Sequence, residues 1–169
     1  MYTPPDWSEW FMKLVYLTST KSKDPKTKIG AIIVKDKRII STGYNGIPTG
    51  VDDLIEDRHN RPSKYKWYEH GERNAIYSAA KHGISTDGAT LYTSLLPCAD
   101  CARGIIQCGI KDVYIHKQFN DVCDVHTRDQ WVGHDEVTFT MFNESDIKIY
   151  VIDVKLECKA YFDGKIFDV

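Results

Sequence analysis

Residues 89–116 read ATLYTSLLPCADCARGIIQCGIKDVYIH, and this stretch decides the fold. Residues 89–94 and 112–116 have the composition of strands. Residues 97–108 between them predict a helix, because Pro97 suits a first helical turn and Gly109 follows the last one. Two strands joined through a helix by short loops imply a parallel pair with a right-handed crossover.

The residues before this unit predict a helix and then a hairpin. Asp6 is a candidate N-cap with Glu9 as its capping-box partner, and Pro25 lies beyond the point where the helix must have ended. Residues 29–34 and 38–44 predict two strands around a turn at 35–37. The apolar face expected for the helix consists of Trp7, Trp10, Phe11, Leu14 and Val15.

The loop at residues 43–50 holds three glycines and a proline, so it is either a connector or the lining of a pocket. Residues 51–69 predict an irregular insertion, and residues 70–82 a helix that ends at Gly83. Residues 120–134 favour no single structure. A helix within 134–145, a strand at 147–153 and a hairpin about Asp163-Gly164 follow. Without repeats or linkers, residues 1–169 predict one α/β domain.

The composition excludes several classes of protein. The chain has 169 residues, a formal charge of −2, 42% hydrophobic residues and 12% aromatic residues, which excludes a disordered chain. The lack of basic bias argues against a nucleic-acid binder, and no apolar run is long enough to span a membrane. Five cysteines without an export signal favour thiols or metal ligands in a reducing cytoplasm over disulfides.

Two short motifs, each at the start of a predicted helix, carry the chemistry. Cys98 and Cys101 lie three residues apart, so both thiols share one face at a helix N-terminus, where thiolates are favoured. His70 offers a third ligand from the start of the other helix. Glu72 lies on the apolar stripe of that helix, and a buried glutamate is rare unless it is paired or functional.

Three protein ligands leave the fourth tetrahedral position open, as in a catalytic zinc site. Glu72 is then placed to move protons between water and a substrate nitrogen. The pattern His70-x-Glu72 with Pro97-Cys98-x-x-Cys101 is the signature of zinc deaminases. A closed structural zinc site is the alternative, with a fourth ligand from Cys108, Cys123 or Cys158, but it leaves Glu72 unexplained.

Over residues 5–118 the chain resembles the cytidine deaminase superfamily, and within it the deoxycytidylate (dCMP) deaminases. Besides the two motifs, the resemblance rests on residues 22–25, 29–31, 40–50, 72–76 and 104–110. It implies a three-layer α/β/α fold with a mixed five-stranded sheet, and hydrolysis of dCMP to dUMP for thymidylate supply. Members are commonly homohexamers, activated by dCTP with Mg²⁺ and inhibited by dTTP. Residues after about 119 match the family poorly.

The resemblance also implies roles for individual residues. His70, Cys98 and Cys101 would bind one zinc ion per subunit, since no cysteine precedes Cys98 to build the second site of some members, and Glu72 would be the proton shuttle. The candidate substrate contacts are Asn45 for the deoxyribose, Ser22 and Lys23 for the phosphate, and Phe119 for the base. The candidate effector residues are Gly43, Tyr44, Gly46 and Asn74.

Plainer interpretations exist for some of these residues. Asn45 also suits a left-handed turn, and Lys23 also suits a solvated surface. The remaining histidines are interpreted as packing or surface residues: His59, His82, His116, His126 and His134.

Two further functions remain to be weighed. One is deamination of another base, such as free cytidine, a riboflavin precursor or a tRNA adenosine; the glycine-rich loop argues for a nucleotide and the lack of a basic stripe against RNA. The other is a silent, zinc-stabilised binding module, against which the intact Glu72 argues.

Overall fold

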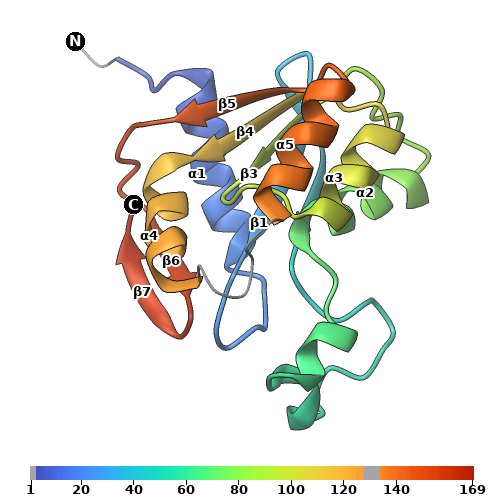
Figure 1. Cartoon of the computed structure of the whole chain (residues 1–169), viewed down its shortest axis with the longest axis vertical. Helices are drawn as coiled ribbons and strands as arrows, with labels where there is room; N and C mark the ends of the chain where they lie inside the picture. Colours follow the sequence, from blue (N-terminus) through green and yellow to red (C-terminus); the bar gives the residue numbers. More distant parts are fainter. Residues whose placement is uncertain (1–2, 128–133) are drawn as a thin grey trace.

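The computed structural model describes residues 3–127 and 134–169, and at its centre is a mixed five-stranded sheet (Figure 1). The strand order is β2-β1-β3-β4-β5. Strand β1 is antiparallel to both of its neighbours, whereas β3, β4 and β5 are parallel, which confirms the predicted crossover. The strands are β1 (Gly30–Lys35), β2 (Arg38–Tyr44), β3 (Thr90–Thr93), β4 (Asp112–His116) and β5 (Lys148–Ile152).

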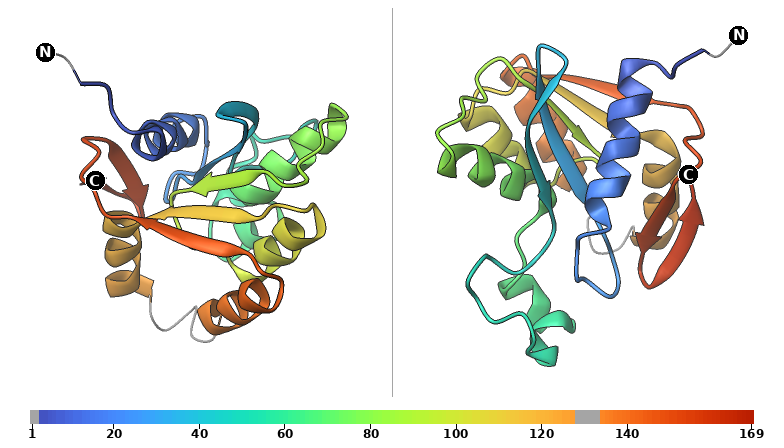
Figure 2. Two further views of the ribbon diagram at one scale, coloured as in Figure 1. Left: turned by 90° about the horizontal axis from the view of Figure 1, so that it is seen from above. Right: turned by 180° about the vertical axis from the view of Figure 1, so that it is seen from behind.

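Helices cover both faces of this sheet, which gives the expected three layers (Figure 2). Alternate side chains of β1 enter two different cores, as the pleat of a strand requires. Ile32 packs in the core of α1 and α4, and Ile33 packs in the core of α2, α3 and α5. The helices are α1 (Trp7–Ser19), α2 (Gly71–Lys81), α3 (Ala99–Gln107), α4 (Lys117–Thr127) and α5 (His134–Glu144).

Helix α1 begins as expected, and Phe11, Leu14 and Val15 of its predicted face pack in the core, but its two tryptophans do not. The Asp6 carboxylate accepts a hydrogen bond from the Ser8 backbone N–H at 3.1 Å, which confirms the N-cap. Met12 is fully buried, whereas Trp7 and Trp10 are 49% and 40% exposed. The expected stripe was therefore wrong at its first turn, where the two indoles pack edge to face on each other near the surface.

The helix expected within 134–145 and the strand expected at 147–153 are confirmed as α5 and β5, and only α4 was not expected. Helix α4 takes up part of the region that the sequence left open, and β5 completes the sheet beside β4. The expected hairpin about Asp163-Gly164 is present, with φ of 48° and 77° at the turn. Its strands are β6 (Lys159–Phe162) and β7 (Lys165–Asp168). No helix among the described residues is long and apolar enough to cross a membrane.

Two glycines let helices lie directly on the strands. A Cβ atom on Gly30 would lie 2.2 Å from the backbone oxygen of Val15 in α1. On Gly43 it would lie 2.2 Å from the backbone oxygen of Gly71, at the start of α2. Gly43 therefore fixes the position of α2 against β2, and with it the first turn that carries the deaminase motif.

Candidate active site

The first turns of α2 and α3 lie together and bring the three expected metal ligands into one cluster. His70 is the N-cap residue of α2 and Cys98 that of α3, with Cys101 in the first turn of α3. The Sγ atoms of Cys98 and Cys101 each lie 3.5 Å from His70 Nδ1. All three ligand atoms lie within 4.8 Å of one another.

These separations fit a zinc ion. Zinc–sulfur bonds of ~2.3 Å and zinc–nitrogen bonds of ~2.0–2.1 Å at a tetrahedral angle place the two ligand atoms about 3.6 Å apart. The observed 3.5 Å agrees for both thiols. The donor set of two thiols and one imidazole is also one that zinc prefers. Among the described residues only these three form such a group, so a zinc ion held by them would have one tetrahedral position open.

The two thiols affect each other's pKa in opposite directions. The hydrogen bond with Cys101, aided by His70, lowers the pKa of Cys98 to about 3. The same hydrogen bond, together with burial, raises the pKa of Cys101. A bound dication would favour loss of the remaining proton, because the metal ligand is the thiolate.

Glu72 lies beside this cluster and is buried, with 4% of its surface exposed. Its Oε2 accepts a hydrogen bond from the Cys101 thiol at 3.6 Å, and its Oε1 lies 3.5 Å from the donating hydroxyl of Thr93. Burial raises the pKa of Glu72, because a buried carboxylate is less well solvated than an exposed one. The carboxylate that looked anomalous in sequence therefore faces the metal ligands.

Sequence reasoning missed an ion pair that braces the site. The Arg73 guanidinium donates to Cys101 Sγ at 3.7 Å and to Glu69 Oε1 at 2.6 Å. Glu69 Oε1 also accepts the backbone N–H of His70 at 2.9 Å. No clear sequence signal pointed to this pair, because Glu69 lies before the first residue of α2.

Asn45 and Ser22 lie close to the site but already have protein partners. The Asn45 amide donates to Thr27 O at 2.8 Å and to Asp24 Oδ2 at 3.3 Å, and its Oδ1 accepts the Ile29 N–H. The Ser22 hydroxyl, 2% exposed, donates to Asn45 O at 2.7 Å. In this conformation both residues shape the loop, and neither offers a spare hydrogen to a ligand.

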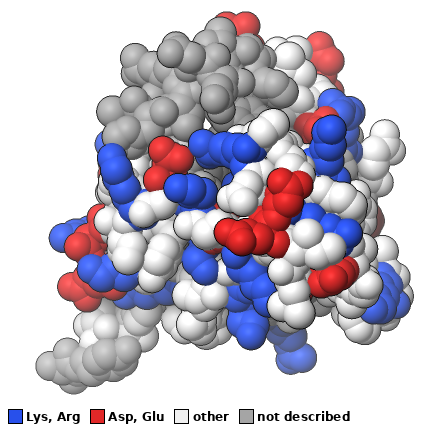
Figure 3. Space-filling view, turned by 90° about the horizontal axis from the view of Figure 1, so that it is seen from below, with Lys and Arg blue, Asp and Glu red and all other residues white. Residues whose placement is uncertain are grey.

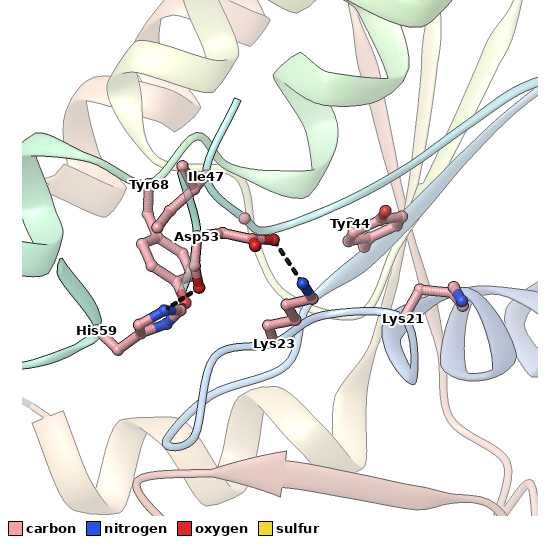
Figure 4. A pocket seen from close by; sticks show the side chains of 8 residues that line it. Lys21, Lys23, Tyr44, Ile47, Asp53, His59 and Tyr68 are labelled. Atoms are coloured by element: carbon pink, nitrogen blue, oxygen red, sulfur yellow. Dashed lines mark hydrogen bonds and ion pairs between the residues drawn. The ribbon is translucent and has the colours of Figure 1, made fainter. Parts of the chain in front are cut away.

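Lys23 lines a pocket at the edge of the glycine-rich loop (Figure 4). Its ammonium forms an ion pair with Asp53 at 2.7 Å and is largely exposed. Tyr44 and Gly46, two of the candidate effector residues, line the same pocket. The other lining residues are Lys21, Ile47, His59 and Tyr68.

Three other candidate residues make only protein contacts in the structure. Phe119 is fully buried between Tyr16 and Phe162, so its ring presents no face to a base. Asn74 donates to the backbone oxygen of Tyr44 at 2.8 Å and so braces the glycine-rich loop. The buried His116 bonds to Tyr16 and Val154, which confirms a packing role. The side chains of His126 and His134 lie outside the described part of the structure.

Charges on the surface are interspersed. On the face shown in Figure 3, the described Lys and Arg side chains alternate with Asp and Glu and form no continuous basic stripe.

A mixed sheet whose facing helix N-termini hold a His, two Cys and a buried Glu defines the zinc-dependent deaminases. Residues 5–117 match the family model for the cytidine and deoxycytidylate deaminase zinc-binding region. The chain belongs to this family.

Several proteins with known names or structures are similar to this chain. Human deoxycytidylate deaminase is 34% identical over 153 residues, which is 86% of this chain and 85% of that one. An uncharacterized deaminase of Aliivibrio fischeri is 35% identical over 143 residues, 85% of this chain and 91% of that protein. The dCMP deaminase of cyanophage S-TIM5, solved with dCMP and dUMP, superposes with a TM-score of 0.65 at 28% identity. That match covers 89% of this chain and all of the phage chain.

Proposed function

We propose that this protein hydrolyses dCMP to dUMP and ammonia, supplying dUMP for thymidylate synthesis. The observation that carries the proposal is Glu72, buried against a His-Cys-Cys cluster with zinc-like spacing. The named relatives support the nucleotide as substrate. Because β5 comes from the poorly matched C-terminal part and completes the sheet, we also propose that the whole chain forms one deaminase unit.

The chain's own residues supply the proton transfers. His70, Cys98 and Cys101 would hold zinc, which when bound supplies Lewis acidity that makes water a better nucleophile at neutral pH. Glu72 accepts a proton as water oxygen bonds to C4 of the cytosine, and delivers it to ring nitrogen N3. The second water proton leaves with the 4-amino group as ammonia when the C4–N bond breaks, so dCMP and water give dUMP and ammonia.

The phosphate preference is the part of the proposal that separates a nucleotide deaminase from a plain cytidine deaminase. We expect kcat/KM for dCMP to exceed that for deoxycytidine at least about a hundredfold, because donors that meet the phosphate are left unpaired without it. Lys23 is exposed, so it contributes less than a buried cation would. Ammonia release from dCMP, deoxycytidine, CMP and dCTP measures this, and a ratio near one would leave a cytidine deaminase.

We further propose allosteric control in a homohexamer, with dCTP and Mg²⁺ activating and dTTP inhibiting. The pocket of Lys21, Lys23, Tyr44 and Gly46 supports a nucleotide site there, because it holds two lysines and an aromatic ring, although Asp53 in the same pocket is paired with Lys23. Saturation by dCMP should be sigmoidal alone and hyperbolic with dCTP and Mg²⁺, while dTTP raises half-saturation. Hyperbolic rates that neither triphosphate changes would exclude this control.

The variant Lys23→Met distinguishes whether Lys23 contacts the substrate dCMP or a triphosphate effector. If it contacts the substrate phosphate, Lys23→Met raises KM for dCMP and leaves the triphosphate responses intact. If it contacts an effector, the same variant loses those responses and keeps its basal rate. Lys37→Met, on the exposed hairpin turn, is the matched control.

We propose a cytoplasmic location for the protein. The free thiols of Cys98, Cys101, Cys108 and Cys158 support it, because a reducing compartment keeps cysteines unpaired.

A further inference from the structure

The insertion between β2 and α2 begins and ends at one pair of hydrogen bonds. Gly46 N–H donates to Glu69 O at 3.0 Å, and Glu69 N–H donates to Gly46 O at 2.8 Å. Residues 47–68 project from the body of the protein beyond this pair and contain two short 3₁₀ turns, Glu56–His59 and Ser63–Lys66 (Figure 1). The residues that follow, His70 and Glu72, belong to the candidate active site.

Lys64 is the point at which this insertion is fastened inside the protein. Its ammonium lies 2.6 Å from Asp24 Oδ2, and the two side chains are only 7% and 2% exposed. The ammonium also lies over the rings of Tyr65 and Tyr68. A lysine is almost never this buried unless it is paired, because burying an ionised group without a partner is costly.

Asp24 in turn bonds to residues 26–27 and to Asn45. Its Oδ1 accepts the backbone N–H groups of Lys26 and Thr27, at 2.8 and 3.2 Å. Its Oδ2, besides accepting from Lys64, accepts from the Asn45 amide at 3.3 Å. The carboxylate therefore has four donors, which is the full complement for its two oxygens.

Asn45 lies immediately before the hydrogen-bonded pair that leads to the metal ligand. A Cβ atom on Gly71 would lie 3.5 Å from the Asn45 backbone nitrogen. Glu69, bonded to Gly46 on one side, accepts the His70 N–H with its side chain on the other. A shift of Asn45 and Gly46 would therefore also move Glu69 and His70, which lie directly beside Glu72.

We propose that Lys64 is a positioning residue, whose buried ion pair with Asp24 holds the loop of Asn45 and Gly46 against the active site and thereby sets substrate affinity. The effect on affinity rests on the proposed function, whereas the effect on loop order does not. Neither Lys64 nor Asp24 reaches Glu72 or the ligand thiols by any contact in the structure's described residues. The chemical step is therefore expected to change little.

The test compares Lys64→Met with the matched control Lys66→Met, an exposed lysine in the same turn. In Lys64→Met we expect KM for dCMP to rise about tenfold or more with kcat within about threefold of wild type. Bound zinc per chain should stay the same. Amide exchange of Ile29 and Gly46, which report on Asn45 and on the base of the insertion, should speed up at least about tenfold. Lys66→Met should change none of these.

If Lys64→Met does not fold, Lys64→Gln takes its place in the same measurements, because glutamine removes the charge but keeps a hydrogen-bond donor for Asp24. Lys64→Arg, which keeps the cation, should recover part of the affinity. A purely structural role for Lys64 predicts a lower melting temperature, while KM and the amide exchange rates measured well below that temperature stay unchanged. This result, in whichever variant folds, would overturn the proposal. If wild type does not deaminate dCMP, the function proposed above fails, and the exchange rates still decide the role of Lys64.

Discussion

Turnover of dCMP by Glu72→Gln is expected to fall by about 10⁴-fold, at the upper end of what a general acid–base group contributes, because this one carboxylate serves both proton transfers. Glutamine keeps the volume of the buried side chain and one of its two accepting oxygens, but it cannot take up the proton of the attacking water. Folding and zinc content should therefore be unchanged. Single-turnover rates with dCMP, beside metal analysis of the same sample, measure the effect.

The matched control is Glu69→Gln, on the other side of His70, whose carboxylate bonds to Arg73 and to the His70 N–H rather than to a thiol. It should lower turnover far less than Glu72→Gln. If Glu72→Gln retained more than roughly a tenth of the wild-type rate, Glu72 would not be the proton shuttle.

Cys98→Ala is expected to lose both zinc and activity. The wild-type chain should contain one zinc ion, and the variant close to none at micromolar chelator, because a His and a single Cys cannot hold zinc as three ligands do. Loss of the metal should also lower thermal stability, since metal binding to a folded site contributes to folding free energy. Metal analysis, turnover and melting curves report the three effects separately.

Cys108→Ala is the control for this variant, because Cys108 ends the same helix and its thiol donates to Ile105 O at 3.4 Å. It should keep zinc and activity, whereas a closed structural site that used Cys108 would lose its metal. Two zinc ions per wild-type subunit would show that a second site exists.

Much of the site was predictable because its residues follow rules of local structure. Cys98 and Cys101 had to share a face once residues 97–108 formed a helix, and Gly83 and Gly109 adopt the positive φ expected after helix ends. His70 and Glu72 are only two residues apart in sequence, so the ligand and the carboxylate both lie at the start of α2. The mixed order of the sheet followed from the resemblance, and the structure confirms it.

What the sequence could not show depends on partners distant along the chain. Nothing local indicates that Lys64 pairs with Asp24, forty residues earlier, or that their network occupies both hydrogens of the Asn45 amide. Phe119 aligned with a substrate-binding position, yet it lies in the core, because α4 turns its ring toward α1 and the C-terminal hairpin. Single positions of a motif do not reveal which side of an element faces the ligand.

The glycines at 30 and 43 have a consequence for how such proteins can diverge. Each removes a side chain where a helix backbone touches a strand, so any larger residue would push one layer away from the next. Ancestors and descendants of this chain can exchange the residues of the insertion or the C-terminal hairpin while keeping the spacing of the layers. They cannot exchange these two positions without moving α1 or α2. A sequence search should therefore still find the two glycines in lineages where the cysteines have been replaced and only the scaffold survives.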